Sequence, residues 1–195
     1  MNWFTADLHL GDPNILRHTR RPWRSWQNMT GGLIRRYNER VAWDDQVFIL
    51  GDLAAGTGEY IRWLVGRLNG FKTLILGNHD LVRPAEFWRN AGITAVYPHL
   101  DIQLGSRRVH MRHAPYSRQT MPPDVDWVLL GHIHNFRTPP AKHTCVCVEW
   151  TDYAPISQDR LKHLLFRAPL QITPPSVTLP LEHGPAAQHR TKGPT

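Results

Sequence analysis

The first half of the chain alternates between short apolar segments and segments with apolar residues at helical spacing. Residues 2–6, 46–50 and 73–76 are short apolar segments of the kind that form buried strands. Between them, apolar side chains recur every three or four positions over residues 29–41 and 59–69, and Gly70 marks the end of the second helix. A shorter helix is expected over residues 84–91. Strands that alternate with helices in this way predict a layered α/β structure.

The second half of the chain is dominated by predicted strands. Residues 100–104 and 107–111, joined at Gly105 and Ser106, indicate a β-hairpin. Further strands are expected over residues 127–130 and 144–148, and a final helix over residues 158–166. A sandwich of two sheets flanked by helices accommodates both halves. We expect one domain over residues 1–167, followed by a Pro-rich tail over residues 168–195 that is mobile or extended.

Composition and charge narrow the class of protein. With 195 residues, 41% of them hydrophobic, the chain can bury one full core. Apolar runs stay well below the roughly 20 residues that cross a bilayer, and the N-terminus has no signal-peptide pattern, so we expect a cytoplasmic protein, in a host cytoplasm if a phage encodes it. The net charge of +7 favours anionic partners such as phosphates and nucleotides, although solubility explains many of these charges equally well.

The chain has two cysteines, Cys145 and Cys147, which lie on the same face of a predicted strand. Neighbours on one face of a strand rarely form a disulfide, and a chain of this size does not need one. We expect two reduced, packed thiols, with a metal-binding role as the alternative.

Polar side chains cluster where the predicted strands end. Because the carboxyl ends of parallel strands meet at one crevice, such clusters converge even when they are far apart in sequence. Taken singly, each residue has an ordinary structural explanation, such as a helix cap, a turn or a hydrogen-bonded histidine. Together they predict a metal site. The five clusters are Asp7-Leu8-His9, Gly51-Asp52, Gly77-Asn78-His79-Asp80, His113 and Gly131-His132-Ile133-His134.

The chemistry of these side chains favours a particular kind of metal. Carboxylate, amide and imidazole ligands without thiolates suit two divalent metal ions. Manganese is the first choice, and iron, zinc, cobalt and nickel are the alternatives. Two ions need one shared ligand, and a carboxylate can bridge because its two oxygens can face two ions at once. Asp52, which follows Gly51, is the candidate bridge. The glycines before Asp52, Asn78 and His132 allow tight turns out of the strands.

The order of the clusters resembles that of the calcineurin-like metallophosphoesterase superfamily. The shared order is D-x-H, G-D, G-N-H-[DE], H and G-H-x-H. The resemblance covers residues 7–134, and Arg21-Pro22, residues 50–52, residues 68–70 and His113-Ala114-Pro115 resemble its small phage- and bacterial-type members. It implies a four-layer α/β sandwich of two mixed sheets flanked by helices. Where relatives often have Gly-His, this chain has Gly11-Asp12, and we expect Asp12 to cap the segment that starts at Asn14.

The same resemblance implies roles for the residues of the site. His79 would face the substrate, and Asp80 would orient its ring. One ion would be held by Asp7, His9, Asp52 and His134. The other would be held by Asp52, Asn78, His113 and His132.

The expected activity is hydrolysis of small phosphodiesters, including cyclic nucleotides such as 2′,3′-cyclic AMP. A hydroxide between the two ions would attack phosphorus, while His79 donates to the leaving oxygen. Residues 17–24 form a basic loop that could bind a second phosphate through Arg20, Arg21 or Arg24, or that could be an ordinary solvated loop. We expect a nucleotide-like substrate and no stable binding to nucleic acid or membrane. The alternatives are a phosphomonoesterase acting on nucleotides or phosphoproteins, a nuclease, and a non-catalytic interaction module.

Overall fold

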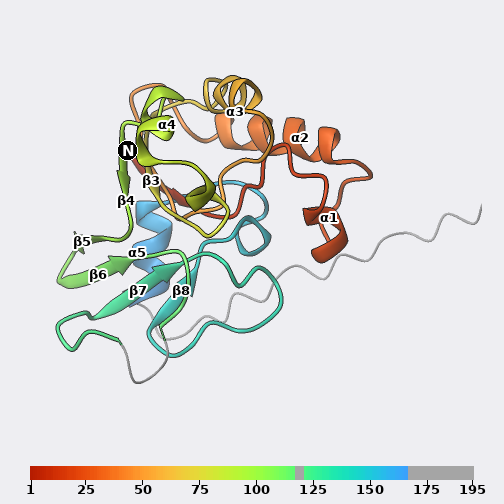
Figure 1. The fold of residues 1–195 in the computed structure, drawn as a ribbon. Helices are drawn as coiled ribbons and strands as arrows, with labels where there is room; N and C mark the ends of the chain where they lie inside the picture. Colours follow the sequence, from red (N-terminus) through yellow and green to blue (C-terminus); the bar gives the residue numbers. More distant parts are fainter. Residues whose placement is uncertain (117–120, 167–195) are drawn as a thin grey trace, which may run out of the picture.

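The computed structural model of the protein describes residues 1–116 and 121–166. The tail expected over residues 168–195 lies outside the described residues. Within them, two β-sheets pack face to face, and helices flank them (Figure 1). The predicted two-sheet α/β sandwich is therefore confirmed.

The first sheet has five strands in the order β4-β3-β2-β1-β9. The four strands from β4 to β1 run parallel to one another, and β9 pairs antiparallel with β1. The parallel register places the carboxyl ends of β1, β2 and β3 at one edge of the sheet. The strands are β1 (Asn2–Thr5), β2 (Gln46–Ile49), β3 (Phe71–Ile75), β4 (Ala95–Tyr97) and β9 (Ile156–Ser157).

Helices cover the face of this sheet that points away from the second sheet (Figure 1). Capping side chains set the N-termini of two of these helices, because Ser25 accepts the Asn28 N–H and Thr57 accepts the Tyr60 N–H. Buried residues at helical spacing, such as Leu33 and Leu64, pack against the strands. The helices are α1 (Ile15–His18), α2 (Trp26–Asn38), α3 (Gly58–Val65) and α4 (Ala85–Asn90).

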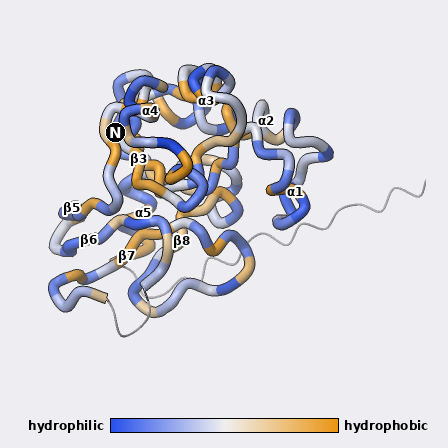
Figure 2. The backbone as a smooth tube through the Cα atoms, in the orientation of Figure 1, coloured by the Kyte–Doolittle hydropathy of each residue, from blue (hydrophilic) through white to orange (hydrophobic). Residues whose placement is uncertain are grey.

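The second sheet has four strands in the order β5-β6-β7-β8. The predicted hairpin is confirmed as the antiparallel pair β5 and β6, whereas β7 and β8 continue in parallel. A second core fills the space between the sheets, and α5 (Gln158–Phe166) adds Leu161 and Leu165 to it. Figure 2 shows hydrophobic residues along β3 and β7. The strands are β5 (Leu100–Leu104), β6 (Arg107–Met111), β7 (Trp127–Leu130) and β8 (His143–Cys145).

Some elements differ from the sequence-based expectation. The helix expected over residues 29–41 begins three residues earlier, at Trp26, because the Ser25 side chain caps it there. The strand expected over residues 144–148 ends at Cys145, because the chain then crosses to the first sheet. Ala6 and Cys147 form a parallel bridge, the Val148 N–H donates to the Ala6 carbonyl, and the short 3₁₀ helix η2 (Val148–Trp150) follows. A second 3₁₀ helix, η1, spans Asp80–Val82.

Over residues 1–116 and 121–166, the helices are too short or too polar to pass through a lipid bilayer.

Candidate metal centre

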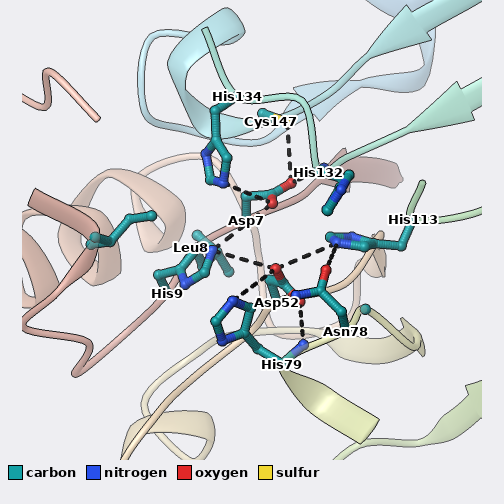
Figure 3. A network of polar contacts seen from close by, with 12 residues as sticks. Asp7, Leu8, His9, Asp52, Asn78, His79, His113, His132, His134 and Cys147 are labelled. Atoms are coloured by element: carbon teal, nitrogen blue, oxygen red, sulfur yellow. Dashed lines mark hydrogen bonds and ion pairs between the residues drawn. The ribbon is translucent and has the colours of Figure 1, made fainter. Parts of the chain in front are cut away.

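The polar clusters predicted at the strand ends meet in one place. Figure 3 shows side chains from the ends of β1, β2 and β3 facing side chains that follow β6 and β7. Backbone hydrogen bonds hold the β1 and β2 ends in register, with Asp7 N donating to Gly51 O at 3.0 Å and His9 N to Asp52 O at 2.9 Å. The residues brought together are Asp7, His9, Asp52, Asn78, His79, His113, His132 and His134.

The backbone turns sharply at these positions. Asp7, His9, Asp52, His132 and His134 all have positive φ angles, between 43° and 66°. Left-handed conformations are unfavourable for residues with a side chain, and strain of this kind is found most often at functional sites. Here it turns successive side chains out of the strand direction and into the shared cluster.

One half of the cluster is formed by Asp7, His9 and His134, whose candidate ligand atoms all lie within 4.8 Å of one another. Asp7 Oδ1 is 3.4 Å from His134 Nε2 and 3.9 Å from His9 Nε2. Asp7 Oδ1 and His9 Nε2 are buried and have no hydrogen-bond partner in the described part of the chain. Buried polar atoms are nearly always satisfied. Unsatisfied atoms of acceptor type that face one another fit a bound cation.

The other half is formed by Asp52, His113 and His132, with Asn78 Oδ1 3.1 Å from His113 Nε2. Asp52 joins the two halves, because its Oδ2 is 3.5 Å from His9 Nε2 and 3.4 Å from His113 Nε2. Its other oxygen accepts the backbone N–H of His79 at 2.9 Å, which fixes the carboxylate. Asp52 is therefore placed between the two halves as expected, but it faces both through one oxygen rather than through the two expected from the sequence.

The site contains buried carboxylates, and neighbouring histidine rings stabilise their negative charge. Burial alone would raise the pKa of Asp52, but its hydrogen bond with His113 and the neighbouring imidazoles lower that pKa to about 2. Burial alone would lower the pKa of His113, but Asp52 and the charge of Asp7 raise it to about 9. Buried carboxylates of this kind would also stabilise a divalent cation.

His79 lies on the open side of the cluster. Its side chain is 54% exposed, and its Nε2 is 3.9 Å from Asp52 Oδ2. The expectation that Asp80 orients the His79 ring is wrong. Its buried carboxylate accepts the backbone N–H groups of Asp52, Leu53 and Gly77 at 2.7–3.0 Å. Asp80 therefore ties together the two turns that carry Asp52 and Asn78 rather than orienting the His79 ring.

The three arginines proposed as phosphate ligands fall into two groups. Arg20 and Arg24 are exposed. Arg21 is buried, and its guanidinium contacts Glu149 and the carbonyls of Asp7 and Leu8. The expectation that Arg21 grips substrate is therefore wrong, because its donors are already used inside the protein.

Three residues near the cluster had no such role in the sequence-based prediction. Glu149 contacts both Arg21 and His134, and the only signal of this was one acidic residue in the apolar run from Val146 to Trp150. Asp12 accepts the Asn14 N–H, as a cap does, but its other oxygen is 3.1 Å from His9 Nδ1. Cys147 Sγ is 3.1 Å from Asp7 Oδ2, and both cysteines are free and buried.

Comparisons with known proteins give a shared fold and a set of related sequences. No protein-family model matches the chain. It is 28% identical over 172 residues to the uncharacterized protein MJ1445 of Methanocaldococcus jannaschii, a match that covers 84% of this chain and 90% of the relative. It is also 37% identical over 95 residues to the Gene 66 protein of Mycobacterium phage D29, covering 46% of this chain and 44% of that one.

Among solved structures, the chain is similar to a protein of unknown function, AQ665 from Aquifex aeolicus. The TM-score is 0.67 with 22% identity, and the match covers 84% of this chain and 98% of the other. A likeness at this level means that the two chains have the same fold. The chain is thus an α/β sandwich with archaeal, bacterial and phage counterparts, and its polar cluster lies where the parallel strands end.

Proposed function

We propose that the protein is a metal-dependent phosphoric ester hydrolase of the calcineurin-like metallophosphoesterase superfamily, and that it acts on small phosphodiesters. The observation that carries the proposal is the pair of His/Asp groups that meet at Asp52. The order of motifs along residues 7–134 supports the same superfamily.

The donor set fits two divalent cations, with Mn²⁺ as the first candidate. Asp7, His9, Asp52 and His134 would hold one ion. Asp52, Asn78, His113 and His132 would hold the other. Two such ions supply a water of lowered pKa and neutralise the oxygens of the phosphoryl group.

The residues of the chain hold the reacting groups around these ions. Asp52 keeps one oxygen between the two halves because its other oxygen is fixed by the His79 N–H. The same turn presents the His79 ring on the exposed side of the cluster, where it can donate a proton to the leaving oxygen. Asp80 holds this turn against the one that carries Asp52.

Preference for diesters is supported by the resemblance to small members of the superfamily, whereas the net charge of +7 favours an anionic substrate of either kind. The test compares hydrolysis of bis-p-nitrophenyl phosphate with that of p-nitrophenyl phosphate, and of 2′,3′-cyclic AMP with that of AMP, in the presence of Mn²⁺. We expect the diesters to be hydrolysed faster. Faster hydrolysis of both monoesters would replace this proposal with that of a phosphomonoesterase.

Replacement of His79 by alanine should separate chemistry from metal binding. In His79→Ala we expect both ions to remain and the turnover number to fall about 10²–10⁴-fold, the usual contribution of a general acid. Turnover and bound metal are measured on the same sample. His99→Ala is the matched control, because His99 is an exposed histidine that precedes β5 and lies outside the metal cluster. Unchanged turnover in His79→Ala would remove its assigned role.

Arg20 and Arg24 remain candidates for a second phosphate contact. The charge reversals Arg20→Glu and Arg24→Glu should raise KM for a nucleotide diester by about tenfold or more, because each loses a charge-assisted hydrogen bond. The turnover number should stay unchanged, since neither residue belongs to the metal cluster. An unaltered KM in both variants would assign the loop to the solvated surface.

A further inference from the structure

A buried ion pair lies directly behind one half of the metal cluster. Arg21 and Glu149 are 128 residues apart in sequence, and their side chains are 0% and 2% exposed. Arg21 Nε and Nη2 both contact Glu149 Oε1, at 2.9 and 2.8 Å. Burial alone would raise the pKa of Glu149, but Arg21 and His134 lower it to about 2. An ion pair this deeply buried seldom makes a protein more stable than apolar residues would in its place. Stability alone therefore does not explain why this ion pair lies behind the metal cluster.

The arginine end of the pair holds the backbone of the first ligand turn. Arg21 Nη2 donates to the Asp7 carbonyl at 2.7 Å, and Nη1 donates to the Leu8 carbonyl at 3.0 Å. The same turn has positive φ at Asp7 and His9. Charge-assisted hydrogen bonds to two successive carbonyls stabilise this strained backbone and so fix the directions of the Asp7 and His9 side chains.

The glutamate end of the pair holds a ligand from the opposite sheet. Glu149 Oε1 is 3.0 Å from His134 Nδ1, and His134 Nε2 is 3.4 Å from Asp7 Oδ1. When His134 donates its Nδ1–H to the carboxylate, its Nε2 has no proton. The lone pair of Nε2 then points towards Asp7 and is available to a metal ion. Carboxylates behind metal-binding histidines set the ring tautomer and orientation in this way.

The second half of the cluster is held by other groups. His113 Nδ1 contacts the Leu50 carbonyl at 2.8 Å, and Asp80 holds the turns that carry Asp52 and Asn78. Within residues 1–116 and 121–166, the hydrogen bonds of Arg21 and Glu149 reach the Asp7–His9 turn and His134 but not His113.

We infer that Arg21 and Glu149 are positioning residues for one metal position, that of Asp7, His9, Asp52 and His134. They set the metal affinity of this position because one rigid ion pair holds ligands from both sheets. They do not affect the metal affinity of the second position. The inference rests on the metal binding in the proposed function.

The experiment removes both charges together. In Arg21→Met/Glu149→Leu, the two buried charges are removed together, so neither is left without a partner. The Asp7 and Leu8 carbonyls and His134 Nδ1 lose their hydrogen bonds, so we expect the melting temperature of the metal-free protein to fall while the protein stays folded. Mn²⁺ is titrated into metal-free protein by calorimetry. We expect one of the two binding steps to weaken about 10–100-fold, as when an outer partner is lost, and the other to stay unchanged. The control Arg36→Gln/Asp152→Asn removes an ion pair with an exposed aspartate and should change neither step.

Several outcomes would overturn the inference. Two unchanged binding steps in the double variant would overturn it. Equal weakening of both steps would also overturn it, because it indicates a purely structural ion pair. Should the double variant not fold, long-range ¹H–¹⁵N spectra of wild-type protein loaded with Zn²⁺ decide the question. We expect His134 to carry its proton on Nδ1 and to bind through Nε2, and binding through Nδ1 contradicts the inference.

These results are distinguishable from a failure of the proposed function. A wild-type protein that binds two ions but hydrolyses no phosphoester removes the proposed activity and leaves the positioning role testable by the same titration. A wild-type protein that binds no divalent ion overturns both.

Discussion

Replacement of Asp52 by alanine should release both ions and reduce hydrolysis to the background rate. Asp52 Oδ2 is the atom that faces both halves of the cluster, at 3.5 Å from His9 Nε2 and 3.4 Å from His113 Nε2. Loss of an outer partner of a metal ligand costs about 10–100-fold in affinity, and loss of a shared ligand should cost more at each position. Metal content after dialysis and turnover with added Mn²⁺ measure the two effects.

Asp44→Ala is the matched control for this variant. Asp44 is an exposed aspartate close to β2 in sequence, and it lies outside the metal-binding groups. It should keep two ions and full activity. An Asp52→Ala protein that retained both ions would show that another residue joins the two halves of the cluster.

Replacement of Gly131 by alanine should damage the site without removing any ligand. A Cβ at Gly131 would lie 2.4 Å from Asp7 Oδ2, 2.7 Å from the Leu50 carbonyl and 2.9 Å from the Ala6 Cβ. Asp7 cannot easily move, because its Oδ2 accepts the His132 N–H and contacts Cys147 Sγ. The two sheets must therefore separate locally. We expect a loss of about 1–3 kcal/mol in the free energy of unfolding, as for other overpacked sites, together with weaker metal binding.

For Gly31→Ala we expect the opposite effect on stability. Gly31 lies in α2, and an added Cβ would have no heavy atom within 4 Å. Because alanine is the better helix former, this variant should gain about 0.5–1 kcal/mol in stability and keep its metal affinity. Thermal unfolding and Mn²⁺ titration of the two variants test the contrast. Equal behaviour of Gly131→Ala and wild type would contradict the close packing at the end of β7.

The sequence predicts that these polar side chains converge, because the information for this is local. Each candidate follows an apolar strand, and parallel strands bring their carboxyl ends to the same edge. Asp7 and Asp52 therefore meet for reasons that can be read from short segments. The helices α2 and α3 are predictable for a similar reason, since the helical spacing of their apolar residues lies within the elements themselves.

The remaining features depend on contacts between distant segments. The strands β4 and β9 have three and two residues, too few for any periodicity, and they exist because longer strands offer them partners. The pattern around Arg21 is that of a basic surface loop, and only the fold places Glu149 beside it. Asp80 is similar, since its role follows from three backbone N–H groups that belong to two separate turns.

Asp52 would be the ligand shared by the two proposed cations. Anomalous diffraction from crystals grown with Mn²⁺ measures this. We expect two peaks roughly 3.5–4 Å apart, one beside Asp7, His9 and His134 and the other beside Asn78, His113 and His132. A map without peaks at the ends of β1 and β2, or with a single ion that does not touch Asp52, would contradict this proposal.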